Sequence, residues 1–212
     1  MEWELFGGLP EDWVRRIMAD ARRRRFGRRE IIFHERDPAA CMHLIARGRV
    51  AVRMSTPLGD MAMLDLLGPG EVLGEMALLS PDAKRSATAC ALEPTETLVV
   101  DAARFAAMRE EQPAVAEVLI RLLAARVRTL NDRLLEAMYV PVDTRLLRRV
   151  LELAEDYGDS ITLTQEDLAG LVGATRATVN RVLRREQAMG TVLLSRGRLE
   201  VLDRAQLARR AR

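Results

Sequence analysis

Short apolar runs separated by turn residues characterise the chain between residues 30 and 100. Glycine and proline interrupt these runs, as in Gly68-Pro69-Gly70, and Leu58-Gly59-Asp60 has the composition of a hairpin turn. The runs are Ile31–Phe33, Leu44–Ala46, Val50–Val52, Met61–Leu67 and Leu98–Val100. Apolar runs of strand length with this punctuation are typical of a compact β barrel or β roll.

A helical period replaces this pattern after Pro113. Apolar residues recur there at alternating spacings of four and three, which is the spacing of a coiled-coil seam. They are Ala116, Ile120, Leu123, Val127, Leu130, Leu134 and Ala137. No glycine or proline interrupts 114–140, and Pro141 cannot continue a helical hydrogen-bond ladder, so we predict one long helix that ends there. The seam favours a dimer; the alternative is a core helix within one globular domain.

Three shorter helices are predicted beyond a hinge at Tyr139–Asp143. The first follows the apolar spacing from Leu146 and stops near Tyr157-Gly158. The second begins at Thr164, which opens a Ser/Thr-x-x-Asp/Glu helix-start signature, and Gly173 ends it. Thr175 can cap the third.

The third helix has two contrasting faces. Val179, Val182 and Leu183 are spaced to point inward, whereas the opposite face carries Arg176, Asn180, Arg181, Arg184 and Arg185. Two apolar runs then flank Ser195-Arg196-Gly197-Arg198, which predicts a hairpin with a basic tip. This is the winged helix-turn-helix pattern, in which a helix enters the major groove and arginines contact guanine and phosphates. The alternative is a solvated cationic helix beside an ordinary hairpin.

A second cluster of candidate residues lies in the β region. Gly74 permits a ligand to approach the protein backbone closely, Glu75 opens a short helical turn, and Arg85 and Ser86 offer donors to a phosphate. A carboxylate for a sugar hydroxyl and an arginine for a phosphate are the groups that a cyclic nucleotide needs. The alternative is a structural ion pair between Glu75 and Arg85 without any ligand.

Composition narrows these possibilities. Hydrophobic residues make up 49% and charged residues 30% of the 212, which excludes global disorder. The formal net charge is only +2, but the segment from Asp143 onward holds 13 arginines against 10 acidic residues. The densest basic run, Arg22–Arg25 with Arg28 and Arg29, is interpreted as a solvated helix end and loop.

Cysteine and histidine usage makes a metal centre unexpected. Cys41 and Cys90 are isolated, and His34 and His43 are interpreted as strand or turn residues. We therefore expect no metal, no haem and no iron–sulfur cluster. The acidic start at Met1–Glu4 does not resemble a signal peptide, and no apolar run reaches the roughly 18 residues of a membrane span. A cytoplasmic protein without membrane contact is the expectation.

Taken in order along the chain, these features resemble the cyclic-AMP receptor protein (CRP/FNR) family of bacterial transcription regulators. The most specific parts are the Gly74-Glu75…Arg85-Ser86 cassette and the stretch Gly173–Arg181. The resemblance implies an α+β fold: a cyclic-nucleotide-binding, jelly-roll-like β-roll over 1–112, a dimerisation helix over 113–139, and a winged helix-turn-helix over 140–212. It also implies a transcription regulator and not an enzyme.

The resemblance also assigns roles to individual residues. Glu75 would contact the ribose 2′-OH, and Arg85 and Ser86 the phosphate, of cyclic AMP or another cyclic nucleotide, beside Gly74. The two hydroxyl residues with which the family contacts the base fall on Leu130 and Asn131 here; only Asn131 can hydrogen-bond. The DNA-binding set would be Thr175, Arg176, Thr178, Asn180, Arg181, Arg184, Arg185 and Arg196.

The recognition helix departs from the family at one position. Ala177 stands where many members have a glutamate that accepts from cytosine, so we expect an altered or relaxed half-site there. The expected partners are a second copy of the chain, a pseudo-palindromic duplex and RNA polymerase. Two other readings remain open. One is a regulator of the same fold that acts without nucleotide, and the other is a nucleotide-binding signalling module that acts through protein contacts.

Overall fold

The computed structural model describes residues 3, 6–7, 9–55, 61–79 and 83–211, and the chain divides into two compact units. The first unit is Met1–Arg128 and the second is Thr129–Arg212. The predicted turn at Leu58-Gly59-Asp60 lies outside the described residues. No helix in the described part of the chain is long and apolar enough to cross a membrane.

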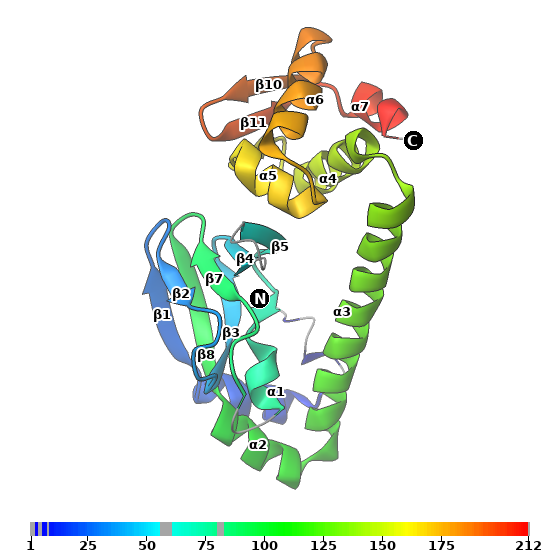
Figure 1. Cartoon of the computed structure of the whole chain (residues 1–212). Helices are drawn as coiled ribbons and strands as arrows, with labels where there is room; N and C mark the ends of the chain where they lie inside the picture. The colour runs from blue at the N-terminus through cyan, green and yellow to red at the C-terminus, as the bar shows by residue number, and fades with distance from the viewer. Residues whose placement is uncertain (1–2, 4–5, 8, 56–60, 80–82, 212) are drawn as a thin grey trace. The chain divides into compact units, whose positions relative to one another are not determined.

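Two antiparallel four-stranded sheets form the centre of the first unit (Figure 1). One sheet has the order β1-β8-β3-β6, with β1 Arg22–Phe26, β8 Thr95–Asp101, β3 Cys41–Arg47 and β6 Val72–Leu73. The other has the order β2-β7-β4-β5, with β2 Ile31–Phe33, β7 Thr88–Ala91, β4 Val50–Ser55 and β5 Met61–Leu67. The predicted β-roll is therefore confirmed.

Successive residues of β3 serve two different cores, because side chains alternate between the faces of a strand. Ile45 packs with residues of both sheets, among them Val50, Leu67 and Leu73, so this core lies between the sheets. Met42 and Leu44 join a second core. That core is completed by three helices: α1 Glu11–Ala19, α2 Ala102–Glu111 and the first turns of α3 Pro113–Tyr139.

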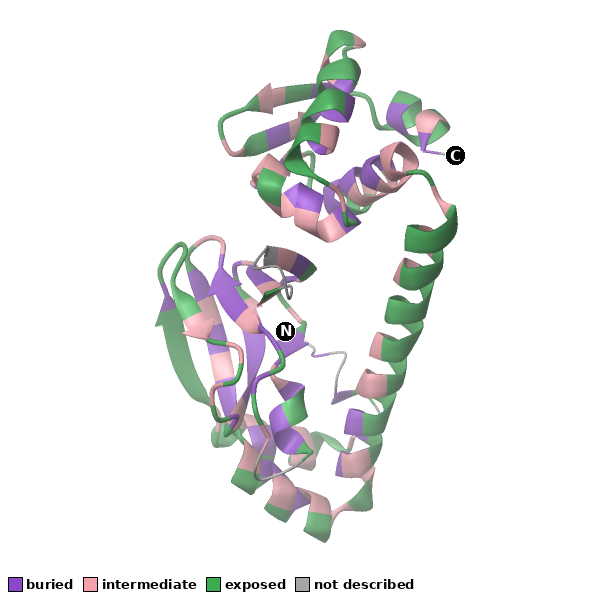
Figure 2. Ribbon diagram, viewed as in Figure 1, coloured by how far each residue is buried: buried purple, intermediate pink, exposed green. Residues whose placement is uncertain are grey.

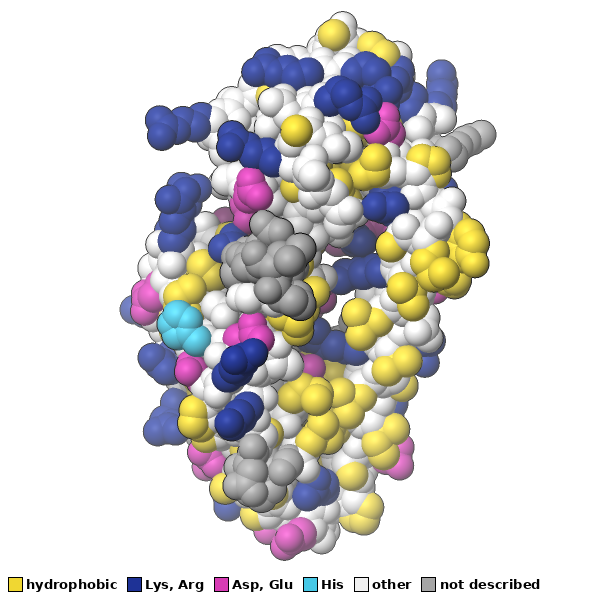
Figure 3. All heavy atoms as spheres, in the orientation of Figure 1, with side chains coloured by type: hydrophobic (Ala, Val, Ile, Leu, Met, Phe, Trp, Pro, Cys, Tyr) yellow, Lys and Arg dark blue, Asp and Glu magenta, His cyan; other side chains and the backbone are white. Residues whose placement is uncertain are grey.

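The long helix α3 begins in the first unit and ends in the second, as the uninterrupted pattern predicted. Its first turns bury Val115, Val118 and Leu119. Beyond them its surface is largely exposed (Figure 2), and the seam residues Ile120, Val127, Leu130 and Leu134 expose 55–59% of their surface. This part of α3 is not a core helix within its own chain. Yellow apolar side chains follow it in Figure 3.

The second unit contains a helix-turn-helix and a small sheet of order β10-β11-β9. Its elements are α4 Val142–Tyr157, β9 Ser160–Ile161, α5 Gln165–Val172, α6 Arg176–Ala188, β10 Val192–Ser195, β11 Arg198–Val201 and α7 Arg204–Arg210. The predicted inward residues Val179, Val182 and Leu183 are fully buried. The winged helix-turn-helix is thus confirmed.

The turn between α5 and α6 forms as its sequence predicts. Thr164 and Asp167 make a reciprocal capping box at the start of α5. Gly173 ends α5 in the left-handed region at φ 61°, and the Thr175 hydroxyl accepts the backbone N–H of Thr178 at 3.2 Å.

Arg145 ties the predicted hinge to the helix-turn-helix. Its Nη1 donates to the carbonyl oxygens of Ala137 and Val140, at 3.2 and 2.8 Å, and its Nη2 donates to that of Val172 at 2.9 Å. The first two carbonyls lie at the end of α3 and the third at the end of α5, where helical carbonyls lack intrahelical partners. One guanidinium therefore links the ends of two helices.

The interpretation of the basic N-terminal run was wrong for Arg22–Arg25 but right for Arg28 and Arg29, which lie in an exposed turn. Arg22–Arg25 forms most of β1, an edge strand, and not a helix end with a loop. Cross-strand pairing explains the difference: Arg23 and Arg25 both form ion pairs with Glu96 of β8. A single-sequence pattern of four like residues does not show such a partner.

Candidate functional site

The backbone at Gly74 lies close to the guanidinium of Arg85 in the first unit. It has φ 75° and ψ 20°, and it precedes the short 3-10 helix η2 Glu75–Leu78, as expected for a helical turn beginning at Glu75. A Cβ at this position would collide with Nη1 of Arg85 and lie 3.3 Å from the carbonyl oxygen of Cys41. The left-handed conformation therefore favours glycine, and any larger residue would also have to displace the end of the Arg85 side chain.

Arg85 is a buried cation without a carboxylate partner in the described structure. Only 6% of its surface is exposed, and its guanidinium lies 4.1 Å from the centre of the Phe33 ring. Its Nη1 donates to the Gly74 carbonyl at 3.3 Å and its Nη2 to the Cys41 sulfur at 3.4 Å. Its Nε is buried without a hydrogen-bond partner among the described residues. Such a group is suited to an anion that brings its own acceptors.

Glu75 pairs with Arg126 of α3 and not with Arg85. Its side chain is 9% exposed, and Oε1 lies 3.6 Å from Nε of Arg126. Arg126 also donates to the Val72 carbonyl at 2.8 Å and faces Asp65 at 3.8 Å. The alternative of a structural Glu75–Arg85 ion pair is therefore not what the structure contains.

Arg126 is a candidate residue that the sequence analysis missed. It lines the same cavity as Glu75, Arg85 and Ser86, and Phe33 contributes to its wall. The only available signal was its place on the long helix, one turn before Leu130. Asn131 lies in the second unit, so its predicted contact with a base is not tested by this arrangement.

His43 is a neutral neighbour of this cluster. Burial, followed by the charges of Arg85 and Arg24, lowers the pKa of His43 to about 4. Its Nδ1 pairs with the Thr97 hydroxyl at 3.0 Å, and its ring lies against Phe26 and Phe33. Among the described residues there is no group of three or more histidine, cysteine, aspartate or glutamate side chains that could hold a metal.

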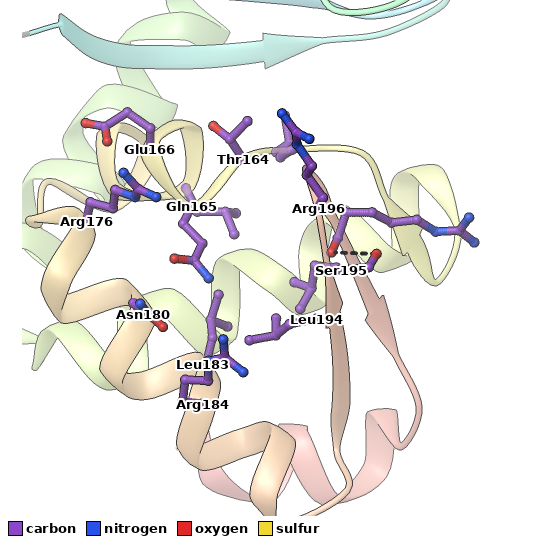
Figure 4. A pocket seen from close by; sticks show the side chains of 15 residues that line it. Thr164, Gln165, Glu166, Arg176, Asn180, Leu183, Arg184, Leu194, Ser195 and Arg196 are labelled. Atoms are coloured by element: carbon purple, nitrogen blue, oxygen red, sulfur yellow. Dashed lines mark hydrogen bonds between the residues drawn. The ribbon is translucent and has the colours of Figure 1, made fainter.

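Another cavity lies in the second unit, on the recognition helix α6. It has a volume of about 520 Å³, and α5, α6 and the β10–β11 turn enclose it (Figure 4). Three residues of α6 line it, each about one helical turn after the one before: Arg176, Asn180 and Arg184. Arg196 lines it from the hairpin turn. These four predicted DNA-binding residues are brought together.

Arg181 and Arg185 do not line this cavity. They occupy a neighbouring stripe of α6, where both pair with Asp143 of α4, at 3.0 and 3.2 Å. Thr175 and Thr178 form a third group at the start of the helix, with their hydroxyl oxygens 3.0 Å apart. The predicted DNA-binding set is therefore divided into three groups with different surroundings.

Family comparisons agree with this arrangement. A family model described as cyclic nucleotide-binding domain matches residues 23–112, and one described as Crp-like helix-turn-helix domain matches residues 144–210. Together they cover the first-unit cluster around Arg85 and the recognition helix with its wing.

Two similar proteins are named as cyclic-AMP regulators. The cyclic AMP receptor protein of Thermus thermophilus is 34% identical over 204 residues, which cover 96% of this chain and 94% of that protein. The CRP-like cAMP-activated global transcriptional regulator of Mycobacterium tuberculosis is 30% identical over 195 residues, covering 88% of this chain and 87% of that protein.

Solved structures show the same fold. The c-di-GMP responsive global regulator CLP of Xanthomonas campestris has a TM-score of 0.78 at 20% identity, over 92% of this chain and 100% of that chain. The Thermus thermophilus catabolite activator protein has a TM-score of 0.57 at 34% identity, over 98% and 97%. The domains and relatives are those of transcription regulators and not of enzymes. This chain belongs to the CRP/FNR family of transcription regulators, with a cyclic nucleotide-binding domain followed by a Crp-like helix-turn-helix.

Proposed function

We propose that this protein is a homodimeric, sequence-specific DNA-binding regulator controlled by a cyclic nucleotide, with cyclic AMP as the first candidate. The observation that carries the ligand proposal is the guanidinium of Arg85, buried without a carboxylate partner in the described structure. A phosphate would replace its weak contacts to a carbonyl and a sulfur with charge-assisted hydrogen bonds. Two relatives, one named a cAMP-activated regulator and the other a cyclic AMP receptor protein, support the choice of nucleotide.

The roles within the site follow from chemistry. Arg85 and Ser86 would bind the phosphate, Glu75 would accept a ribose hydroxyl, and Gly74 would let the ligand approach the backbone. Asn131 would contact the base. Because the side chain of Leu130 offers no hydrogen bond, discrimination between purine bases would depend on Asn131 and on the shape of the binding site.

Ligand entry would require local movement. The cavity beside Arg85 has a volume of about 60 Å³. Ligand pockets usually measure roughly 300 Å³ or more, so the site would have to widen, and we propose that Arg85 leaves the Phe33 ring and Arg126 leaves Glu75. Arg126 belongs to α3, so the same movement would act on the long helix. The ligand would then shift the population between two packings of α3, and the hinge near Pro141 would redirect the recognition helices.

Dimerisation would follow from the apolar stripe of α3. The exposed residues include Ile120, Val127, Leu130 and Leu134, which occupy seam positions. We propose 113–139 as the dimerisation helix, between a sensor domain at 1–112 and a DNA-binding domain at 140–212. A two-fold dimer would place its recognition helices roughly 34 Å apart on a pseudo-palindromic duplex. RNA polymerase is the further partner we propose.

The decisive experiment combines two measurements on the full chain. Calorimetry with cyclic AMP should detect binding to the wild type and to Arg104→Gln, whose arginine pairs with Asp20 at an exposed site. Binding should be lost in Arg85→Gln. Unchanged cyclic AMP affinity in Arg85→Gln would refute the ligand site.

A DNA titration tests control by the ligand. Duplex affinity is measured with cyclic AMP, with cyclic GMP and without nucleotide. Equal affinity in all three conditions would favour the alternative of a regulator that acts without nucleotide. Leu130 at the position expected to contact the base is the observation that keeps this alternative open. The signalling-module alternative is disfavoured by the match to a Crp-like helix-turn-helix domain.

The half-site proposal concerns Ala177. The resembled family often reads a TGTGA-like half-site with a glutamate at this position. Alanine cannot accept a hydrogen bond from cytosine N4, so we propose that this half-site is altered or relaxed at the corresponding base pair. Selection of binding sites from random DNA tests this proposal. A strong requirement for cytosine at that pair would contradict it.

A further inference from the structure

A single carboxylate holds two arginines of the recognition helix. Asp143 is the second residue of α4, and its Oδ1 accepts from Nη2 of Arg181 at 3.0 Å. Its Oδ2 lies 3.2 Å from Nη1 of Arg185, whose Nε also lies 3.6 Å from Oε1 of the buried Glu186. The two arginines are four residues apart and so occupy one stripe of α6. Both oxygens of Asp143 are thus engaged, and only 26% of its side chain is exposed.

The two arginines are themselves accessible. The Arg181 side chain is 60% exposed and that of Arg185 is 45% exposed. They are cations on the exterior of the helix proposed to enter DNA. A DNA phosphate or a guanine edge would compete with Asp143 for the same N–H donors. The negative charge of Asp143 would also lie beside the approaching phosphates, which raises the electrostatic cost of contact.

The neighbouring stripe of α6 differs, although Glu166 of α5 lines the same cavity. Arg184 donates to the Gln187 side-chain oxygen at 3.4 Å, and in the described structure neither Arg176 nor Arg184 has an ion-pair partner. Arg176 and Arg184 line the cavity beside the wing. The four arginines of this helix therefore divide into two without an ion pair in the described structure and two that share Asp143, one of which also contacts Glu186.

The position of Asp143 connects this contact to the hinge. It lies two residues after Pro141 and two before Arg145, whose guanidinium binds the carbonyls of Ala137 and Val140 at the end of α3. Asp143 and Arg145 thus belong to the same first turn of α4. A change in the direction of the α3 end would act on the turn that carries Asp143.

We propose that Asp143 is a positioning residue that competes with DNA for Arg181 and Arg185. DNA binding by these two arginines requires their release from Asp143, so the acid lowers affinity for any duplex. This inference rests on the proposed DNA-binding function.

The test compares Asp143→Asn with Asp159→Asn in the full chain. Asp159 pairs with Arg204 at 2.6 Å, so the control removes the same charge from the same domain without touching α6. Affinity is measured for a duplex with two inverted TGTGA half-sites and for a scrambled duplex, both with saturating cyclic AMP. Asp143→Asn should bind both duplexes about three- to tenfold more tightly, the range expected from releasing two exposed ion pairs. Asp159→Asn should bind as the wild type does.

Two further readouts separate competition from a structural effect. The gain should shrink between about 50 and about 200 mM salt, because ions screen the charge of Asp143. It should also disappear when Asp143→Asn is combined with Arg181→Gln and Arg185→Gln, since no arginine is left to release. Asp143→Ser serves as a second variant and should reproduce the gain.

The outcomes are distinguishable from failure of the proposed function. Wild-type or weaker affinity in both Asp143 variants would overturn the competition, and so would a gain that persists without the two arginines. If the wild type fails to bind any duplex at low salt, with or without cyclic AMP, the proposed function itself falls.

Discussion

Acidification is expected to destabilise the β-roll through His43. The pKa of this buried imidazole is lowered from 6.5 to about 4, first by burial and then by the charges of Arg85 and Arg24. Between these two values the unfolded chain binds more protons at this site than the folded chain. The stabilising effect of keeping His43 neutral is therefore complete above pH 6.5 and is lost as the pH falls toward 4.

The magnitude follows from the shift. A difference of 2.5 pKa units corresponds to about 3 kcal/mol in the free energy of unfolding when the loss is complete, and to about 2 kcal/mol at pH 5. His43→Gln removes the titrating group while keeping a polar partner for Thr97. His34→Gln is the matched control because His34 is exposed.

Urea unfolding between pH 4.5 and pH 8 measures this contribution. The chain has two tryptophans, Trp3 and Trp13, and both belong to the first unit, so their fluorescence reports on the unit that contains His43. Protein concentration is held constant because association changes apparent stability. The wild type and His34→Gln should lose about 2 kcal/mol more than His43→Gln between pH 8 and pH 5. Identical pH profiles for the wild type and His43→Gln would refute the reasoning.

Four other changes have expected outcomes. Leu134→Asp should place a charge on the exposed seam of α3 and raise the dimer dissociation constant at least about tenfold, measured by sedimentation; an unchanged dimer would contradict the seam. Gly74→Ala should cost about 1–3 kcal/mol in urea unfolding because of its positive φ, and should weaken cyclic AMP binding by displacing Arg85; wild-type values for both would refute this. Thr164→Ala should cost about 1 kcal/mol in the thermal unfolding of the C-terminal domain by removing the α5 cap, whereas no change would show that the cap is dispensable. Arg196→Ala should reduce the slope of log affinity against log salt by about 0.9 if the wing contacts one phosphate, and an equal slope would exclude that contact.

Local signals in the sequence predicted those parts of the fold that depend on local chemistry. The end of α3 before Pro141 and the caps at Thr164 and Thr175 follow from rules that involve only a few neighbouring residues. The helices α1, α2 and α7 were not predicted, because their helical character depends on the cores and partners they meet.

In the candidate sites, too, residue types could be predicted from the sequence, whereas contacts between distant residues could not. The cassette residues Gly74 and Arg85 were identified by residue type, but the pairing of Glu75 with Arg126 joins positions 51 residues apart. The division of the arginines on α6 depends on where the first turn of α4 lies. Helical spacing places Arg181 and Arg184 on one broad polar face, and only the fold shows that Asp143 stands against one part of it.

The strand β1 has a consequence for the behaviour of the protein at high concentration. It forms the edge of its sheet, and Arg22–Arg25 are all exposed. The open edge of a strand is a template for pairing with another chain, which leads to aggregation. Two copies meeting along this edge would bring rows of arginines together, and Glu96 is the only acid that pairs with them in the described structure. The basic run should therefore disfavour pairing of two copies along this edge.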